Sequence, residues 1–302
     1  MTFYKTKIRF LILISSLYVS LLSAQDQEVV ISIDKLSNDV YMLTGQGGNI
    51  GIYIGEKNVF MIDDQFDRLS DKIKAAIASL TNKPIAFLFN THMHGDHTGG
   101  NANFNTGLTT LVAHNNVRKR VMASQQKRLD DKKITLAYYD KMLPEVTFSE
   151  DITFYDKDET IMAFHVHNAH TDGDAMVYFV NNDVIHMGDT YFAGRYPYID
   201  LKSGGSLQGF IDAHKKALMV ISEETQIIPG HGRPSTKKDL ESYVSMLVDI
   251  KTNIMAAIAA GKSLEEVKSN NSISAAYDST HGNSFIKPEV MRETFYKSLK
   301  GE

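Results

Sequence analysis

Four short polar strings, each placed directly after or at the end of an apolar run typical of a β-strand, constrain most strongly how this chain can fold. They are residues 90–100 (NTHMHGDHTGG), 167–174 (HNAHTDGD), 186–190 (HMGDT) and 228–232 (IPGHG). Proteins that alternate strands with helices place their functional side chains just past the carboxyl ends of the strands. The strings therefore predict strands that end at a common edge, where histidine and aspartate side chains from distant parts of the chain meet.

The rest of the sequence alternates strands and helices in an order that suits this arrangement. Apolar runs predict strands over 29–33, 40–44, 49–54, 59–62, 85–89 and 110–113, and again over 152–155, 161–166, 176–180, 184–186 and 226–228. Helical spacing predicts helices over 70–80, 116–127 with a polar continuation to 140, 207–219 and 237–260, and a capping box at 263–266 predicts the start of another. We expect an α/β (α+β) fold of two sheets packed face to face with helices outside, in one domain over residues 25–302.

The chain contains no cysteine, so any metal ion must be held by nitrogen and oxygen atoms. The first string offers three imidazoles and one carboxylate within six residues: His92, His94, Asp96 and His97. Its glycines predict a loop, in which His92 and His94 converge while Asp96 and His97 turn elsewhere. This density of histidine and aspartate favours a metal site over an incidental polar loop.

Taken in order, the four strings resemble the motifs of the metallo-β-lactamase superfamily: H-x-H-x-D-H, then a His followed by T-D-G, then G-D, then G-H-G. The resemblance extends from about residue 40 to residue 233. It implies a four-layer αββα sandwich with a dinuclear metal site at one edge of the sheets. It assigns to the first metal His92, His94 and His170, and to the second Asp96, His97 and His231. It places Asp189 as a bridge between the two metals.

The implied ligand set suits hydrolysis. Zinc accepts imidazole and carboxylate ligands, and iron or manganese fits the same set. A catalytic zinc site keeps a position for water, whose pKa the metal lowers to about 7. We therefore expect a hydrolase with two zinc ions per chain, in which a metal-bound hydroxide oriented by the catalytic residue Asp96 attacks a carbonyl group.

Differences between this sequence and individual branches of the superfamily narrow the range of expected substrates. One β-lactamase subclass has a cysteine ligand where Asp189 stands, and the combination of His97 with Asp189 resembles glyoxalase II, lactonases and general metallohydrolases. The expected substrate is a β-lactam, amide, lactone or ester. The alternatives are a glyoxalase II-like thioesterase or an acyl-homoserine lactonase, and, from a different class, a non-enzymatic metal-binding module.

Three residues shortly after Asp189 are candidates for the mouth of a substrate pocket: Tyr191, Arg195 and Tyr196. The planar guanidinium of Arg195 suits a substrate carboxylate, since it can donate two parallel hydrogen bonds. A structural salt bridge is the alternative for this residue.

The amino-terminal residues are typical of a secretory signal peptide over residues 1–24. Lys5, Lys7 and Arg9 precede the apolar run 10–22, which is shorter than the about 20 residues of a membrane span. An uncleaved anchor helix is the alternative. Removal of residues 1–24 takes away these three positive charges and no negative ones, so the formal net charge changes from −4 to −7. We expect a periplasmic or secreted protein that binds a small-molecule substrate, and neither nucleic acid nor, after cleavage, a membrane.

Overall fold

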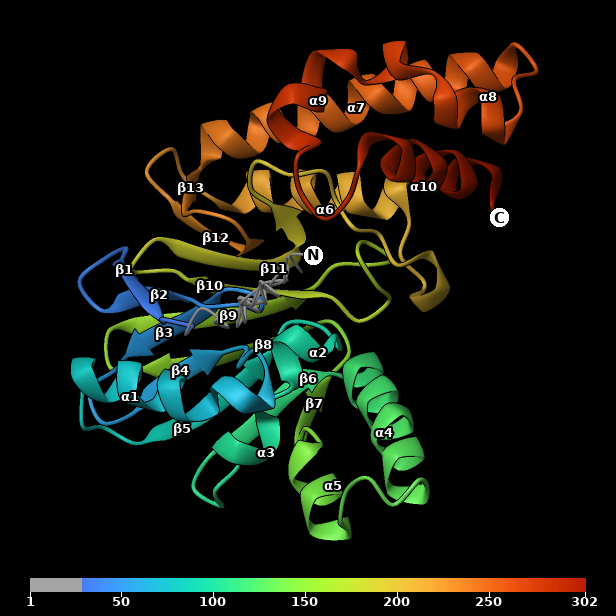
Figure 1. Cartoon of the computed structure of the whole chain (residues 1–302). Coiled ribbons are helices and arrows are strands. Elements are labelled where there is room, and N and C mark those ends of the chain that lie inside the picture. Colours follow the sequence, from blue (N-terminus) through green and yellow to red (C-terminus); the bar gives the residue numbers. More distant parts are fainter. Residues whose placement is uncertain (1–28) are drawn as a thin grey trace, which may run out of the picture.

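Two β-sheets lie face to face in the computed structural model, which describes residues 29–302; the expected signal peptide lies outside these residues (Figure 1). Within residues 29–302 the first sheet has seven strands, in the order β1 (Ser32–Lys35), β2 (Val40–Thr44), β3 (Ile50–Ile54), β4 (Val59–Ile62), β5 (Ile85–Asn90), β6 (Thr110–His114) and β7 (Val146–Phe148). In the same part of the chain the second sheet has six, in the order β13 (Ser235–Thr236), β12 (Gln226–His231), β11 (Val184–Phe192), β10 (Ala175–Phe179), β9 (Glu159–His165) and β8 (Asp151–Asp156).

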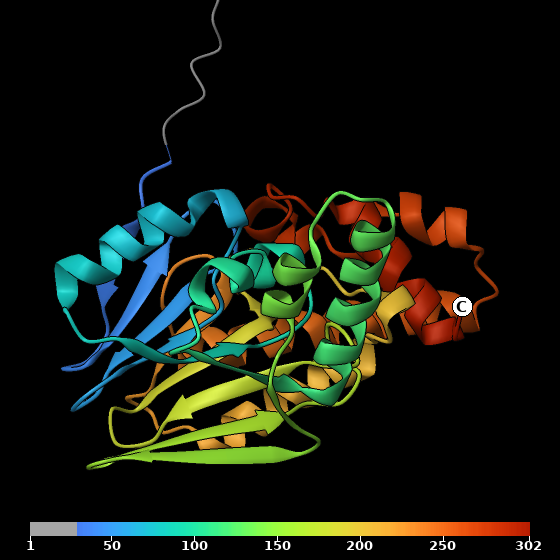
Figure 2. The ribbon, with the colours of Figure 1, turned by 90° about the horizontal axis from the view of Figure 1, so that it is seen from below.

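Helices cover the outer face of each sheet. Beside the first sheet lie α1 (Ser70–Leu80), α2 (Gly95–Thr98), α3 (Asn101–Phe104), α4 (Asn115–Asp130) and α5 (Leu136–Met142). Over the second lie α6 (Leu207–Val220), α7 (Lys237–Ala259), α8 (Leu264–Ser269), α9 (Ala275–His281) and α10 (Pro288–Lys300). Seen from below, α1 and α4 lie in front of the strands (Figure 2). The four layers confirm the αββα fold.

Apolar side chains on both faces of the central strands explain the four layers. In β4, Phe60 and Ile62 belong to the core between the sheets, whereas Val59 and Met61 pack in the cluster that includes Ile73 of α1. All four β4 side chains are buried. A strand that is apolar on both faces must be covered on both, and the second sheet meets one face while helices meet the other.

Each expected element has a counterpart, some with shifted bounds, but β7, β13, α2, α3, α9 and α10 were not expected from the sequence. Two of the expected elements differ clearly. The helix expected over 116–140 is two helices, because the chain turns after α4 through Lys132, whose φ is +57°, and Thr135 then caps α5. The strand expected over 29–33 begins at Ser32, where pairing with Thr44 at the end of β2 starts. None of the helices within residues 29–302 is long and apolar enough to cross a membrane.

Parallel pairing brings the ends of the ligand-bearing strands to one edge. Strands β4, β5 and β6 are parallel in the first sheet, and β11 and β12 are parallel in the second. Strand β9 runs in the same direction as β11, since both are antiparallel to β10. The polar strings after β5 and β9, and those within β11 and β12, therefore lie at a common edge of the sandwich.

A buried arginine holds the carboxyl-terminal helices together. The side chain of Arg292 on α10 is 1% exposed. Its guanidinium donates hydrogen bonds to the Lys268 carbonyl (3.0 Å), Ser274 Oγ (2.8 Å) and Asn271 Oδ1 (2.9 Å). One side chain therefore connects α10 to α8 and to the segment that leads into α9.

Replacement of Arg292 by alanine should lower the free energy of unfolding by about 3 kcal/mol, because three hydrogen bonds from a buried charged group would be lost. Urea unfolding followed by circular dichroism measures the change. Arg233→Ala is the control: the Arg233 side chain is 82% exposed, and its loss should alter stability by less than about 0.5 kcal/mol. An Arg292→Ala variant as stable as the wild type would contradict this role.

Candidate metal centre

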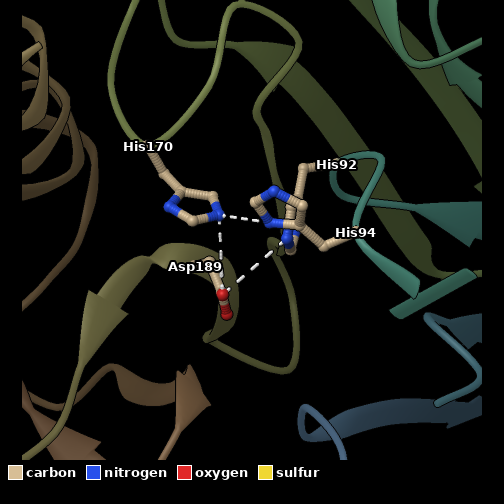
Figure 3. Close-up of side chains that lie close together, drawn as sticks. All are labelled: His92, His94, His170 and Asp189. Atoms are coloured by element: carbon tan, nitrogen blue, oxygen red, sulfur yellow. Dashed lines mark hydrogen bonds and ion pairs between the residues drawn. The ribbon is translucent and has the colours of Figure 1, made fainter. Parts of the chain in front are cut away.

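Three histidines and one aspartate from both sheets form the first cluster. Figure 3 shows the side chains of His92, His94, His170 and Asp189 pointing toward one another. His170 Nε2 lies 2.8 Å from His94 Nδ1. Asp189 Oδ2 lies 3.7 Å from His92 Nε2 and 3.6 Å from His170 Nε2. The four ligand atoms all lie within 4.8 Å of one another, so a single metal ion can contact each of them.

A second cluster lies beside the first and consists of Asp96, His97 and His231. His231 Nε2 lies 3.2 Å from Asp96 Oδ2 and 3.3 Å from Asp189 Oδ1. His97 Nε2 lies 3.0 Å from Asp189 Oδ1. Asp189 therefore presents Oδ2 to the first cluster and Oδ1 to the second. The structure brings together all seven residues that we expected to bind metal.

The first polar string is part loop and part helix. His92 and His94 lie in the loop after β5, but Gly95–Thr98 forms one helical turn, α2, where we expected the loop to continue. The backbone amide of His97 donates to the His94 carbonyl (3.0 Å) within this turn. The turn directs Asp96 and His97 into the second cluster, while the loop directs His92 and His94 into the first.

An irregularity in β11 sets the position of Asp189. The pairing of β11 with β12 shifts register on both sides of Gly188, whose φ is +53°. A Cβ at Gly188 would lie 2.7 Å from Thr91 Oγ1, so glycine permits β11 to approach the loop after β5. Bulges of this kind re-aim side chains near functional sites. Gly188 therefore lets Asp189 lie between ligands that come from both sheets.

Asp63 orients the second cluster from outside it. This buried carboxylate follows β4 directly, and its Oδ2 lies 2.7 Å from His97 Nδ1. Both of its oxygens also accept from Thr91, through the backbone amide (2.8 Å) and the hydroxyl (2.7 Å). An acceptor at Nδ1 fixes the tautomer of an imidazole and leaves Nε2 to bind metal.

Two further acceptors orient the first cluster. Asp200 Oδ2 lies 3.2 Å from His94 Nε2, which leaves Nδ1 of that ring to face the cluster. The Tyr198 carbonyl lies 2.7 Å from His170 Nδ1. Both come from the segment between β11 and α6, so this segment positions rings of two other loops.

Burial keeps two imidazoles of the first cluster, those of His92 and His170, uncharged. Burial lowers the pKa of His92 well below its ordinary value, and the neighbouring His97 adds to this effect. Burial also lowers the pKa of His170 to about 4. Both rings are therefore unprotonated at pH 7, the form in which histidine binds metal.

The second cluster retains protons when no metal is bound. Burial opposes protonation, but Asp189 and Asp63 raise the pKa of His97 well above its ordinary value. Burial also lowers the pKa of His231, but Asp189 and Asp96 outweigh it and raise the pKa to about 9. In return, the charges of His97 and His231 hold the pKa of Asp189 well below its ordinary value although burial would raise it.

Buried atoms without a hydrogen bond support metal binding at the two clusters. Among the described residues, five buried side-chain polar atoms lack a hydrogen bond, and three of these are His92 Nε2, His97 Nε2 and Asp189 Oδ1; the last two lie 3.0 Å apart but form no hydrogen bond. Buried polar atoms in folded proteins are normally partnered. All three belong to the two clusters, and imidazole nitrogen with carboxylate oxygen is a donor set that zinc accepts. A metal ion in each cluster would give these atoms their partners.

The centre opens into a cavity of about 500 Å³. Four residues of the clusters lie on its wall, namely His94, Asp96, Asp189 and His231. The rest of the lining is Phe66, Gly95, Phe192, Arg195, Tyr196, Tyr198, Ser284, Phe285 and Ile286. The wall is therefore rich in aromatic side chains and carries one arginine.

Two of the three expected pocket residues, Arg195 and Tyr196, line this cavity, but the expectation for Tyr191 is wrong. Tyr191 is 2% exposed, its hydroxyl donates to Ser235 Oγ (3.3 Å), and its ring packs against Tyr243 in the core. Phe192 faces the cavity instead, with its ring parallel to that of His231 at a centroid distance of 5.6 Å. Because the pairing register shifts between Gly188 and Phe192, side chains in this part of β11 do not alternate regularly between the two faces of the sheet.

Asp63 and Asp200 are site residues that were not predicted from the sequence. The position of Asp63 could have been predicted, because this acidic residue directly follows the apolar run 59–62, just as the four polar strings follow their strands. The position of Asp200 could not have been predicted, since it lies in an irregular segment and is identified only by its contact with His94.

The fold and the site together define a metalloprotein with two adjacent ligand clusters at the edge of a four-layer sandwich. The family profile of the metallo-beta-lactamase superfamily matches residues 43–231, and the chain belongs to this superfamily. Family and site make it a metal-dependent hydrolase of that superfamily. A search of curated protein sequences finds no match.

Solved structures share the fold at low sequence identity. The DIM-1 metallo-β-lactamase is 19% identical, with a TM-score of 0.58 over 73% of this chain and 98% of its own. A metallo-β-lactamase from Pontibacter korlensis is 16% identical, with a TM-score of 0.59 over 72% and 99%. The inverting sec-alkylsulfatase Pisa1 from Pseudomonas sp. is 12% identical, with a TM-score of 0.67 over 88% of this chain and 50% of its own.

The two clusters should differ in the protons that metal binding displaces. The first zinc ion should displace no proton from His92 or His170 at pH 7, because burial lowers the pKa of both rings, that of His170 to about 4. The second must displace protons from both His97, whose pKa is raised well above its ordinary value, and His231, whose pKa is about 9. Its affinity should therefore fall at least tenfold for each pH unit from 9 down to 6. Calorimetric zinc titrations in two buffers of different ionisation enthalpy count these protons. Equal proton release for both ions would contradict the assignment.

Asp63→Asn should weaken the second metal about 10–100-fold and leave the first nearly unchanged. An amide nitrogen cannot accept a hydrogen bond, so either His97 or Thr91 loses its acceptor. The same zinc titration measures both affinities. Asp67→Asn, at an exposed carboxylate of the neighbouring 3₁₀ helix Asp67–Leu69, is the control. An equal loss at both clusters would show that Asp63 supports the fold rather than His97.

Proposed function

We propose that this protein uses two zinc ions to hydrolyse an acyl bond in a small extracytoplasmic molecule: an ester, a lactone, an amide or a β-lactam. The observation that carries the proposal is the position of Asp189, which presents one oxygen to each cluster on the wall of an accessible cavity. A storage protein has no need for such a cavity beside its metal. This argues against the non-enzymatic metal-binding module.

The seven ligand residues would have separate roles. His92, His94 and His170 would hold one ion, and Asp96, His97 and His231 the other, with Asp189 between them. Bound zinc supplies a lowered pKa for coordinated water and polarises a carbonyl oxygen.

Asp96 is the residue best placed to orient the attacking water. Its side chain is 27% exposed and lines the cavity, unlike the fully buried His97 beside it. Burial would raise its pKa, but the hydrogen bond from His231 outweighs this and the pKa is lowered, so the carboxylate is ionised at pH 7. An ionised carboxylate at the cavity wall can accept a hydrogen bond from water and hold it toward the substrate.

Arg195 supports an anionic group on the substrate. No described residue forms an ion pair or side-chain hydrogen bond with its guanidinium, which favours substrate binding over the structural salt bridge. Planar bidentate donation suits a carboxylate. A free carboxylate occurs in many β-lactams and in glutathione thioesters, so both stay within the proposal.

We also propose that the mature protein begins near residue 25 and acts outside the cytoplasm. The basic start and the apolar run over 10–22 support this proposal. Mass spectrometry of the protein purified from a periplasmic extract tests it: the proposal expects cleavage near residue 24 and is contradicted by an intact amino terminus in the cytoplasmic fraction.

A substrate panel on zinc-loaded protein tests the reaction. It contains nitrocefin and a carbapenem, acyl-homoserine lactones, glutathione thioesters, p-nitrophenyl esters, a phosphodiester and a secondary alkyl sulfate, the last because of the likeness to Pisa1. Hydrolysis of an acyl substrate is expected, with Asp96→Asn lowering kcat about 10²–10³-fold. Asp212→Asn, at an exposed carboxylate on α6, should leave kcat unchanged. Inactivity on the whole panel with two zinc ions bound would favour the metal-binding module, and activity on the sulfate alone would replace the acyl substrate.

A further inference from the structure

The loop between α9 and α10 contributes a wall of the cavity from outside the matched family segment. Ser284, Phe285 and Ile286 line the cavity, whereas the family profile ends at residue 231. The two compared β-lactamases cover 73% and 72% of this chain, and nearly all of their own. The wall around Phe285 is therefore supplied by the carboxyl-terminal helices that follow the family segment.

Phe285 lies at the end of a row of rings that leads to the metal ligands. Its ring packs edge-on against Tyr198 at a centroid distance of 6.3 Å. The Tyr198 ring in turn lies 5.9 Å from that of His94 and 5.6 Å from that of His170. Phe285 and Tyr198 thus form one apolar surface beside the first cluster.

This apolar surface is exposed to the cavity rather than used in packing. The Phe285 side chain is 83% exposed and that of Tyr198 is 38% exposed. A phenyl ring left in water forgoes the favourable free energy of its burial. A substrate with an apolar group would recover this free energy by covering both rings.

The loop that carries Phe285 is held at both ends. Before it, the His281 carbonyl accepts from the Tyr196 amide (3.1 Å), and the Tyr196 hydroxyl donates to Asp278 Oδ1 (2.7 Å) in α9. After it, α10 begins at Pro288 and is tied down by Arg292. The loop is thus anchored on both sides of the exposed ring before substrate binds, which limits the entropic cost of binding.

The cation of the cavity lies in a different part of its wall. Among the described residues that line the cavity, Arg195 is the single lysine or arginine. Arg195 also lines a neighbouring cavity with the β2–β3 loop residues 45–47, whereas Phe285 does not. The wall therefore offers a cationic region toward the β2–β3 loop and an apolar region toward the α9–α10 loop.

We propose that Phe285 determines substrate specificity, and that the substrate is a small amphipathic anion whose alkyl or aryl group packs against Phe285 and Tyr198 while its anionic group faces Arg195. This inference rests on the proposed function for the reaction, but the recognition it describes can be measured by binding alone. It assigns a role to carboxyl-terminal helices that hold none of the seven ligands.

The probes are ethylphosphonate and octylphosphonate, titrated by calorimetry into the zinc-loaded protein. The wild type should bind octylphosphonate at least tenfold more tightly than ethylphosphonate, because the longer chain covers the two rings. Phe285→Ala should reduce this preference at least fivefold, and Phe285→Leu should restore most of it. Arg195→Ala should weaken both probes by the same factor and leave the preference intact.

The control variant is Tyr155→Ala, which removes an aromatic ring of similar exposure (79%) on β8, outside the cavity lining. It should leave both affinities unchanged. A wild type without chain-length preference, or a Phe285→Ala variant that keeps the full preference, would overturn the inference. If the preference behaves as expected while no panel substrate is hydrolysed, the proposed reaction fails and the inference on recognition stands.

Discussion

The shared carboxylate of Asp189 is the interaction on which the centre depends. It lies in the middle of the second sheet's longest strand, and its two oxygens lie within 3.7 Å of four imidazoles, from His92, His97, His170 and His231. These rings come from both sheets, so the carboxylate can reach them only where the two sheet edges meet. The register shift at Gly188 and the close approach to Thr91 are the local features that make this meeting possible.

The two clusters are unequal because their surroundings differ. The imidazoles of His92 and His170 are neutral through burial, whereas those of His97 and His231 are held protonated by the carboxylates around them. The outer acceptors follow the same division, with Asp63 supporting the second cluster and Asp200 and the Tyr198 carbonyl supporting the first. The fold therefore prepares one site that binds metal with little competition from protons and one where protons and metal compete.

Much of this could be predicted from the sequence, because the seven ligands lie in strings that follow or end apolar strands. The rule that strand ends meet at one edge predicts that they gather, and the resemblance to the superfamily assigns them to the two clusters. Tyr191 shows where sequence proximity fails as a guide. It lies two residues from Asp189, but because β11 is irregular there, Phe192 lines the cavity and Tyr191 does not. Asp200 and Phe285 could not be predicted, because their positions follow from tertiary packing of irregular segments and no local periodicity marks them.

We infer that two metal ions share Asp189. Anomalous diffraction from crystals of the zinc-loaded protein, recorded at the zinc edge, tests it most directly. We expect two peaks about 3.5–4 Å apart. One should lie among His92, His94 and His170 and the other among Asp96, His97 and His231, with an oxygen of Asp189 in contact with each. A single peak, or two peaks of which only one contacts Asp189, would contradict it.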